Sequence, residues 1–259
     1  MPNNPLALIG RSVLSIFGIA GRLTLFTLES SSHCFRPPFY PKLILHQMVK
    51  IGFHSLPVVG LTAIFTGMVL VLQTYTGFSD FAAESSIPII VVRSLTRELG
   101  PVLAALMVAG RVGAATAAEI GTMRVTEQID ALTTLSTNPY KYLIAPRLIA
   151  GFISLPLLVA VAEIIGVMGG YLVSTYKLGF NPTVYIQNIF DALETLDIVS
   201  GLVKAAVFGF LIVLMGCYHG YNSRGGAQGV GAATTNAVVS GAALILVFNY
   251  IITEAFFSK

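Results

Sequence analysis

Long apolar stretches separated by short polar ones make up most of the chain after residue 55. Five of these stretches reach the length of about 20 residues that an α-helix needs to cross the hydrocarbon of a bilayer. We predict membrane-spanning helices over Leu56–Phe78, Ile87–Ala118, Leu143–Tyr176, Ile198–Tyr218 and Thr235–Phe257. The second and third exceed the thickness of a bilayer, so we expect them to tilt or to extend beyond it.

The N-terminal residues follow a different pattern. From Leu6 to Leu28, apolar residues recur at steps of three and four, and Arg11 and Arg22 share one helix face. This predicts an amphipathic helix lying in the headgroup plane, with an uncleaved membrane span as the alternative. A proline-rich break over 36–41 then precedes a basic elbow. We therefore divide the chain into interfacial and elbow helices, residues 1–55, and one transmembrane domain, residues 56–259.

The composition supports a membrane protein. Charged residues make up 10% of the chain, against about 25% in soluble domains. Hydrophobic residues make up 55% and the mean hydropathy is +0.81, which excludes a soluble globular protein and a disordered one. The net charge of +3 is too small to indicate a nucleic-acid partner. The chain is thus predicted to be an all-α polytopic membrane protein.

The distribution of charge predicts the orientation. With the N-terminus in the cytoplasm, the inner segments contain most of the basic residues and the outer segments are mostly acidic, as the positive-inside rule requires. Five spans then place the C-terminus in the periplasm. Cys34 and Cys217 fall near the reducing side, so we expect free thiols. The glycine-rich stretch 225–231 is predicted to be a flexible inner loop.

Among the charged residues within the predicted spans, Arg93, Arg97 and Glu98 lie in the outer part of the second span and Lys204 lies in the outer part of the fourth. Charges at membrane depth are costly and usually face a cavity or a partner. We predict that Glu98 pairs with Lys204 and that Arg97 is left for a ligand phosphate. Being adjacent, Arg97 and Glu98 are not expected to share a helix face. The alternative is a purely structural ion pair.

A short amphipathic helix is predicted where the second span enters the cytoplasm. Thr126 is the expected N-cap and Glu127 lies in the first turn. Ile129 and Leu132 form an apolar edge, with Asp130 beside it. A helix of this kind between two spans is typical of the surface that a permease presents to a cytoplasmic motor. A linker lying on the lipid surface is the alternative, although an anionic leaflet would repel its acidic residues.

Small residues recur every fourth position in three predicted spans, a pattern that permits close helix packing in lipid. We expect some of these ridges to meet a second copy of the chain, with packing inside one chain as the alternative. The sequence contains no phosphate-binding GxxxxGK[ST] loop and no catalytic or metal-binding motif. We therefore expect no catalysis, no cofactor and no metal. The ridges comprise Ala105, Ala109, Gly113, Ala117 and Gly121; Ala162, Gly166, Gly170 and Ser174; and Ala233, Ala237 and Gly241.

Several motifs together carry a family resemblance. The stretches Arg97-Glu98-Leu99-Gly100-Pro101, Ala109-Gly110-Arg111-Val112-Gly113, 118–123 and 126–132 closely resemble the MlaE-type permease family. This family forms the membrane subunit of ABC transporters that move phospholipid between the inner membrane and periplasmic MCE-domain proteins. The resemblance extends from about residue 40 over nearly the whole remaining chain.

The resemblance implies a homodimer in the bacterial inner membrane that maintains the lipid asymmetry of the outer membrane. It also implies a hexameric MCE ring, a small STAS-domain partner and a cytoplasmic ATPase that hydrolyses ATP. Arg97, Glu98 and Lys204 fit the positions of charges that contribute to lipid handling in relatives. Some relatives have an acid where this chain has Asn249, and whether Glu254 replaces it stays open. The implied ATPase contacts are Glu127, Gln128, Ile129, Asp130 and Leu132.

Two other function classes fit parts of the pattern. A secondary transporter needs an ionisable relay deep in the spans, and Glu163 is the one candidate. A membrane scaffold that anchors a periplasmic complex needs neither charges in a cavity nor a coupling helix.

Overall fold

The computed structural model describes residues 5–78 and 86–258, without the side chains of residues 5–9, 11–13 and 16. The described chain is almost entirely helical and contains no strand. Three segments are π-helical, with i→i+5 hydrogen bonds (η4, η5 and η6), and η1 is a 3₁₀ turn. The elements are α1 (Pro5–Phe35), α2 (Pro41–Ile51), η1 (Phe53–Ser55), α3 (Leu56–Phe78), α4 (Ile87–Ser94), η4 (Leu95–Leu99), α5 (Gly100–Val108), η5 (Ala109–Gly113), α6 (Ala114–Val125), α7 (Gln128–Thr134), η6 (Tyr140–Ile144), α8 (Ala145–Tyr176), α9 (Pro182–Ala192), α10 (Thr195–Tyr221) and α11 (Gly226–Phe257).

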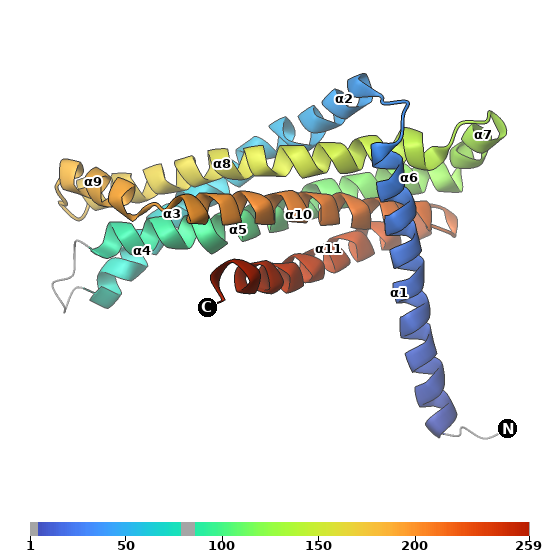
Figure 1. Cartoon of the computed structure of the whole chain (residues 1–259), viewed down its shortest axis with the longest axis horizontal. Coiled ribbons are helices and arrows are strands. Elements are labelled where there is room, and N and C mark those ends of the chain that lie inside the picture. The colour runs from blue at the N-terminus through green and yellow to red at the C-terminus, as the bar shows by residue number, and fades with distance from the viewer. Residues whose placement is uncertain (1–4, 79–85, 259) are drawn as a thin grey trace.

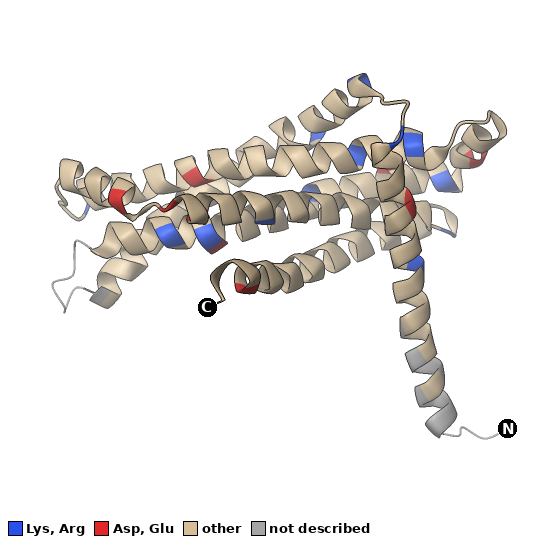
Figure 2. Cartoon of the chain, viewed as in Figure 1, with Lys and Arg blue, Asp and Glu red and all other residues tan. Residues whose placement is uncertain are grey.

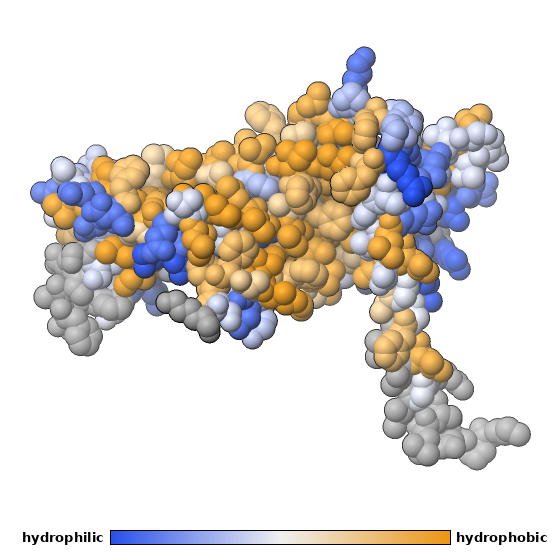
Figure 3. Space-filling model, in the orientation of Figure 1, coloured by the Kyte–Doolittle hydropathy of each residue, from blue (hydrophilic) through white to orange (hydrophobic). Residues whose placement is uncertain are grey.

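Five helical segments of the described chain are long and apolar enough to cross a membrane, which confirms the all-α polytopic fold. They lie side by side in an elongated bundle (Figure 1). Hydrophobic side chains cover much of its middle and hydrophilic ones gather towards its two ends (Figure 3). The segments are Pro41–Gly77, Ile87–Val125, Tyr140–Tyr176, Thr195–Tyr221 and Gly226–Phe257.

The N-terminal helix α1 runs across the bundle instead of joining it (Figure 1). This is the orientation expected of a helix in the membrane plane, given that the bundle helices span the membrane. Phe26 fixes its C-terminal half, because its ring lies 5.4–6.0 Å from the rings of Tyr140, Tyr218 and Tyr221. Arg22 is exposed, while the side chain of Arg11 lies outside the described part.

The elbow and the first span form one continuous packing unit. Both α2 and α3 pack on α8, and η1 separates them. The predicted domain boundary after residue 55 coincides with the end of η1, but the division into two domains stays a prediction.

The prediction of a flexible glycine-rich inner loop is wrong. Gly226 begins α11, so that Gly229 and Gly231 are helical. Gly225 and Gly226 have φ values of +87° and +66°, which glycine adopts without steric cost. At Gly229, the Arg224 carbonyl leaves no room for a Cβ. These glycines therefore allow a tight reversal between α10 and α11.

The small-residue ridges pack inside the single chain. All twelve residues of the three ridges are buried in it, so the expectation that some of them meet a second copy is wrong. Close approach in lipid depends on the absence of side chains. Gly67 of α3 faces the Gly166 backbone of α8, and Gly151 of α8 faces Gly209 of α10. α8 is therefore held between α3 and α10 by backbone contact.

Cys34 and Cys217 are free thiols, as predicted. Cys217 is fully buried. Cys34 lies against the Ala145 carbonyl, 3.9 Å from its Sγ, and burial raises the pKa of its thiol.

We expect Gly67→Ala to destabilise the bundle, because a Cβ at this position overlaps the Gly166 carbonyl. Overpacking of this kind costs about 1–3 kcal/mol. Gly77→Ala is the matched control on the same helix, since nothing lies within 4 Å of its added Cβ. Thermal unfolding of the two detergent-purified variants, followed by size-exclusion chromatography, measures the effect. Equal melting temperatures would show that the α3–α8 crossing is not tightly packed.

Candidate functional site

The predicted pair between the second and fourth spans is present. Lys204 Nζ lies 2.7 Å from Glu98 Oε1 and also donates to the Arg97 carbonyl at 2.8 Å. The Lys204 side chain is completely buried, whereas that of Glu98 is 37% exposed. A buried ammonium is tolerable only with a partner that compensates its charge. The pair therefore joins η4 to α10 in the apolar part of the bundle.

Helix α11 supplies two further donors to Glu98. Asn249 Nδ2 donates to Oε2 and Thr253 Oγ1 donates to Oε1, both at 2.9 Å. Asn249 thus belongs to the cluster as a hydrogen-bond donor to the acid. Glu254 is exposed and makes no ion pair with the described residues. It does not take the place of the acid that the resemblance suggested at position 249.

The prediction that Arg97 is left unpaired is wrong. Its Nε donates to Asp197 Oδ1, and its guanidinium lies over the Phe257 ring, 4.4 Å from the centroid. Asp197 is completely buried, while Arg97 stays 30% exposed. The Nη1 and Nη2 groups of Arg97 make no hydrogen bond within the described chain. Arg97 is therefore anchored through Nε, and the N–H donors of Nη1 and Nη2 stay available to a ligand.

Asp197 is the residue that sequence reasoning missed, because it was assigned to an outer loop. It is the N3 residue of α10 and forms a capping box with Glu194, and Arg93 Nε lies 3.9 Å away. The Glu-x-x-Asp spacing at the start of a span was the available signal, since an acid at N3 points back to the helix N-terminus.

Arg97 and Glu98 contact the same two partner helices, although adjacent residues are not expected to share one helix face. On α10 they contact Asp197 and Lys204, seven positions apart, and on α11 they contact Phe257 and Thr253, four apart. Both residues lie in η4, where the π-turn contains one residue more than an α-turn. The two side chains diverge and reach α10 and α11 at different heights.

The predicted cytoplasmic helix is α7. Glu127, Gln128 and Asp130 are exposed, whereas Ile129 is buried and Leu132 packs with it against the core. Arg124 Nη1 donates to Asp130 Oδ1 at 2.6 Å, which ties α7 to the end of α6. The amphipathic pattern is confirmed, and α7 exposes an acidic face.

The proposed N-cap of this helix is wrong. Thr126 Oγ1 donates back to the Thr122 carbonyl at 2.8 Å, and the N-cap position belongs to Glu127, which has a φ of +60°. The reversal after α6 needs a left-handed residue, and this displaces the cap by one position.

Comparison with known proteins identifies the family. The pattern described as Permease MlaE matches residues 44–255, which is most of the chain. The chain belongs to the MlaE permease family. It is 60% identical over 249 residues to a probable ABC transporter permease protein of Rickettsia felis, with 96% of each chain covered.

Two more distant relatives have more specific names. The intermembrane phospholipid transport system permease protein MlaE of Haemophilus influenzae is 35% identical over 257 residues, with 98% of each chain covered. The chloroplastic protein TRIGALACTOSYLDIACYLGLYCEROL 1 of Arabidopsis thaliana is 36% identical over 244 residues, with 94% of this chain and 68% of the relative covered. The chain is thus an ABC transporter permease of the MlaE family.

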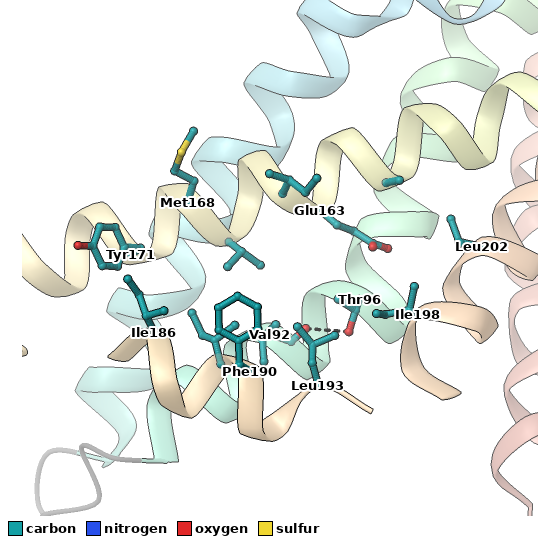
Figure 4. A pocket seen from close by; sticks show the side chains of 14 residues that line it. Val92, Thr96, Glu163, Met168, Tyr171, Ile186, Phe190, Leu193, Ile198 and Leu202 are labelled. Atoms are coloured by element: carbon teal, nitrogen blue, oxygen red, sulfur yellow. Dashed lines mark hydrogen bonds between the residues drawn. The ribbon is translucent and has the colours of Figure 1, made fainter. Parts of the chain in front are cut away.

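A cavity of about 470 Å³ contains Glu163, the candidate for an ionisable relay. Among the side chains drawn in Figure 4, Glu163 is the one carboxyl group, and its surroundings are mostly apolar. Its buried Oε1 has no hydrogen-bond partner among the described residues. Gly100 and Gly201 make room for it, because a Cβ at either position would lie 3.3 Å from Oε1. The described lining therefore offers this MlaE-family permease no chain of ionisable groups.

We expect Lys204→Ala to lower stability more than the double change Glu98→Gln with Lys204→Ala. The single change leaves a carboxylate with only neutral donors, Asn249 and Thr253, and breaking a buried pair costs about 3–5 kcal/mol. The double change removes both charges. Melting temperatures of the purified variants test this order. If the losses of stability in the single variants Glu98→Gln and Lys204→Ala sum to the loss in the double variant, the two residues are not coupled.

Proposed function

We propose that this permease moves phospholipid between the inner membrane and a periplasmic MCE-domain partner and so maintains the lipid asymmetry of the outer membrane. The supporting observation is the cluster of Arg97, Glu98 and Lys204 between α10 and α11 in an otherwise apolar bundle. The name of the Haemophilus influenzae relative points to the same substrate class.

Arg97 suits a phosphate group in this scheme. Asp197 holds its Nε, which orients the guanidinium, and the exposed Nη groups keep N–H donors for a charge-assisted contact. Glu98 and Lys204 neutralise each other, so they hold α10 and α11 in place beside Arg97 without adding net charge. Acyl chains then contact the apolar surface below the cluster.

We further propose that the cluster lies towards the periplasm and α7 towards the cytoplasm, with the N-terminus inside and the C-terminus outside. Basic residues gather near the α7 end of the bundle (Figure 2). Arg124 lies at the end of α6, before α7, and Lys141 and Arg147 lie at the start of the third span. The acidic residues Asp191 and Glu194 lie near the other end, which fits the positive-inside rule.

A separate ATPase is the motor in this proposal, and it contacts the exposed Glu127, Gln128 and Asp130 of the α7 region. Ile129 and Leu132, the other two predicted contacts, pack inward and hold α7 against the core. Movement of α7 reaches the cluster through one continuous segment, Ile87–Val125. Its π-turns, η4 and η5, interrupt the regular α-helical hydrogen bonds and are natural places for such a helix to bend.

The complete transporter would contain two copies of this permease, with a STAS-domain protein on the ATPase. Helices α3 and α11 are the least enclosed spans, with 22% and 17% of their most apolar windows buried, against 50% or more in the others. A second copy therefore has an open apolar face on α11, the least enclosed of these spans, on which to pack.

We expect Arg97→Gln to reduce the phospholipid that co-purifies with the transporter several-fold, because a phosphate loses its charged donor. Arg93→Gln is the matched control, since Arg93 also lies beside Asp197 but binds Glu194 at 2.7 Å. Lipid phosphorus per protein is the measurement. Equal lipid in both variants would remove Arg97 from headgroup binding, and proton-coupled uptake by the permease alone would favour a secondary transporter.

We expect Glu127→Lys and Asp130→Lys to weaken co-purification of the ATPase while the spans stay folded. Reversing an exposed charge rarely destabilises a fold, but it lowers the affinity of a complementary partner. Glu254→Lys, at the other end of the bundle, is the control. Full ATPase recovery with both α7 variants would show that the motor binds elsewhere.

A further inference from the structure

A polar cavity lies apart from the charged cluster, near the cytoplasmic end of the bundle in the proposed orientation. It has a volume of about 220 Å³ and lies between α2–η1 and the η5–α6 segment. Arg111, at its wall, is 14 residues after Arg97 on one continuous segment, or about 21 Å along a helix. The lining residues are Gln47, Lys50, Ile51, His54, Arg111, Val112, Ala115, Thr116 and Glu119.

Helical spacing explains why these residues meet. Gln47, Lys50 and His54 follow one another at steps of three and four, and so line one face of the α2–η1 segment. Arg111 and Glu119 are eight apart on the facing segment, which places them two turns from each other on one face. Two polar helix faces are thus turned towards each other across the cavity.

Hydrogen bonds fix the Arg111 guanidinium but leave some of its N–H donors unpaired. Its Nε and Nη2 donate to Ser55 Oγ at 3.0 and 2.7 Å, and Nη2 also reaches the Lys50 carbonyl. Its Nη1 makes no hydrogen bond with the described residues. This leaves two N–H donors of a fixed guanidinium at the cavity, a geometry suited to the oxygens of a phosphate.

Positive charge exceeds negative charge around the cavity. Lys50 Nζ lies 3.6 Å from Glu119 Oε1, but the same oxygen also pairs with Nη2 of the buried Arg147 at 3.1 Å. One carboxylate is therefore shared by two cations, and Arg111 adds a third. The excess attracts an anion, and at a membrane boundary with little water the attraction is weakly screened.

The surface next to the cavity is apolar. Helix α3 exposes Val58, Leu61, Phe65 and Val69, each at least 46% accessible, at steps that keep them on one face. Met107, one turn before Arg111, is 39% exposed. α3 has 23 residues, enough to cross the hydrocarbon alone, so the cavity at its N-terminal end lies at the level of the headgroups.

We propose that this cavity binds the phosphate of an anionic phospholipid from the cytoplasmic leaflet, with the acyl chains along the exposed face of α3. Arg111 and Lys50 contact the phosphate. The assignment to this leaflet rests on the proposed orientation, whereas binding itself does not depend on transport by the outer cluster.

Photo-crosslinking of the full chain in nanodiscs of zwitterionic phosphatidylcholine tests the site. A trace of phosphatidylglycerol with a photoreactive headgroup is expected to label peptides containing residues 47–54 or 111–119. Lys50→Gln is expected to lower this labelling about three- to tenfold, because a charge-assisted contact is lost. Lys42→Gln is the control, since Lys42 is exposed on the same helix and does not line the cavity. Arg111→Lys, which keeps the positive charge but loses the planar guanidinium and its N–H donors, is expected to lower labelling as well.

Competition identifies the ligand class. Unlabelled phosphatidylglycerol should displace the probe, whereas diacylglycerol, which lacks the phosphate, and inorganic phosphate, which lacks the chains, should not. Displacement by inorganic phosphate at equal concentration would overturn the lipid assignment. Equal labelling in the Lys50→Gln and Lys42→Gln variants would overturn the site. Labelling of peptides around Arg97 in the same sample reports on the outer cluster separately, so failure of either proposal is recognised independently.

Discussion

A charge placed in the apolar part of a membrane protein must find its counter-charge within the protein, and the arrangement of η4, α10 and α11 satisfies this constraint. Lys204 and Asp197 are both completely buried, so neither tolerates the loss of its partner on η4. Glu98 and Arg97 are those partners, and they follow each other in the sequence. The second and fourth spans are thereby held in one register, and α11 joins the cluster through Asn249, Thr253 and Phe257.

On the side of α10 that faces α8, close backbone packing keeps α10 in the position that this register requires. In lipid no hydrophobic force draws apolar helices together, so contact depends on packing and on hydrogen bonds. Gly209 of α10 meets Gly151 of α8, and Gly166 of α8 meets Gly67 of α3. The three helices form a closely packed layer. The segment with η4 and η5 contains the charged residues and the two π-turns, so its α-helical hydrogen bonds are interrupted where those of the layer are regular.

The same segment connects the two ends of the molecule. Its N-terminal part contains Arg97 and Glu98, its π-turn η5 contains Arg111, and its C-terminal end leads through Arg124 to Asp130 of α7. An event at α7 is therefore mechanically linked to both phosphate-binding candidates. This continuity would let an ATPase at α7 act on the proposed lipid sites without an ionisable relay, and the isolated Glu163 is consistent with that.

The apolar pattern alone determined the number of spans and most of their limits, because the length of hydrocarbon to be crossed leaves few alternatives. The Glu98–Lys204 pair was also predictable, since charges of opposite sign at similar depth have few other partners. Only the tertiary structure decided that Arg97 belongs to Asp197, that Thr126 does not cap α7 and that the small-residue ridges pack within one chain. These outcomes depend on a π-turn that shifts side-chain directions, on a left-handed residue at Glu127 and on which helices are neighbours. Such features arise from contacts between distant segments, and local periodicity contains no information about them.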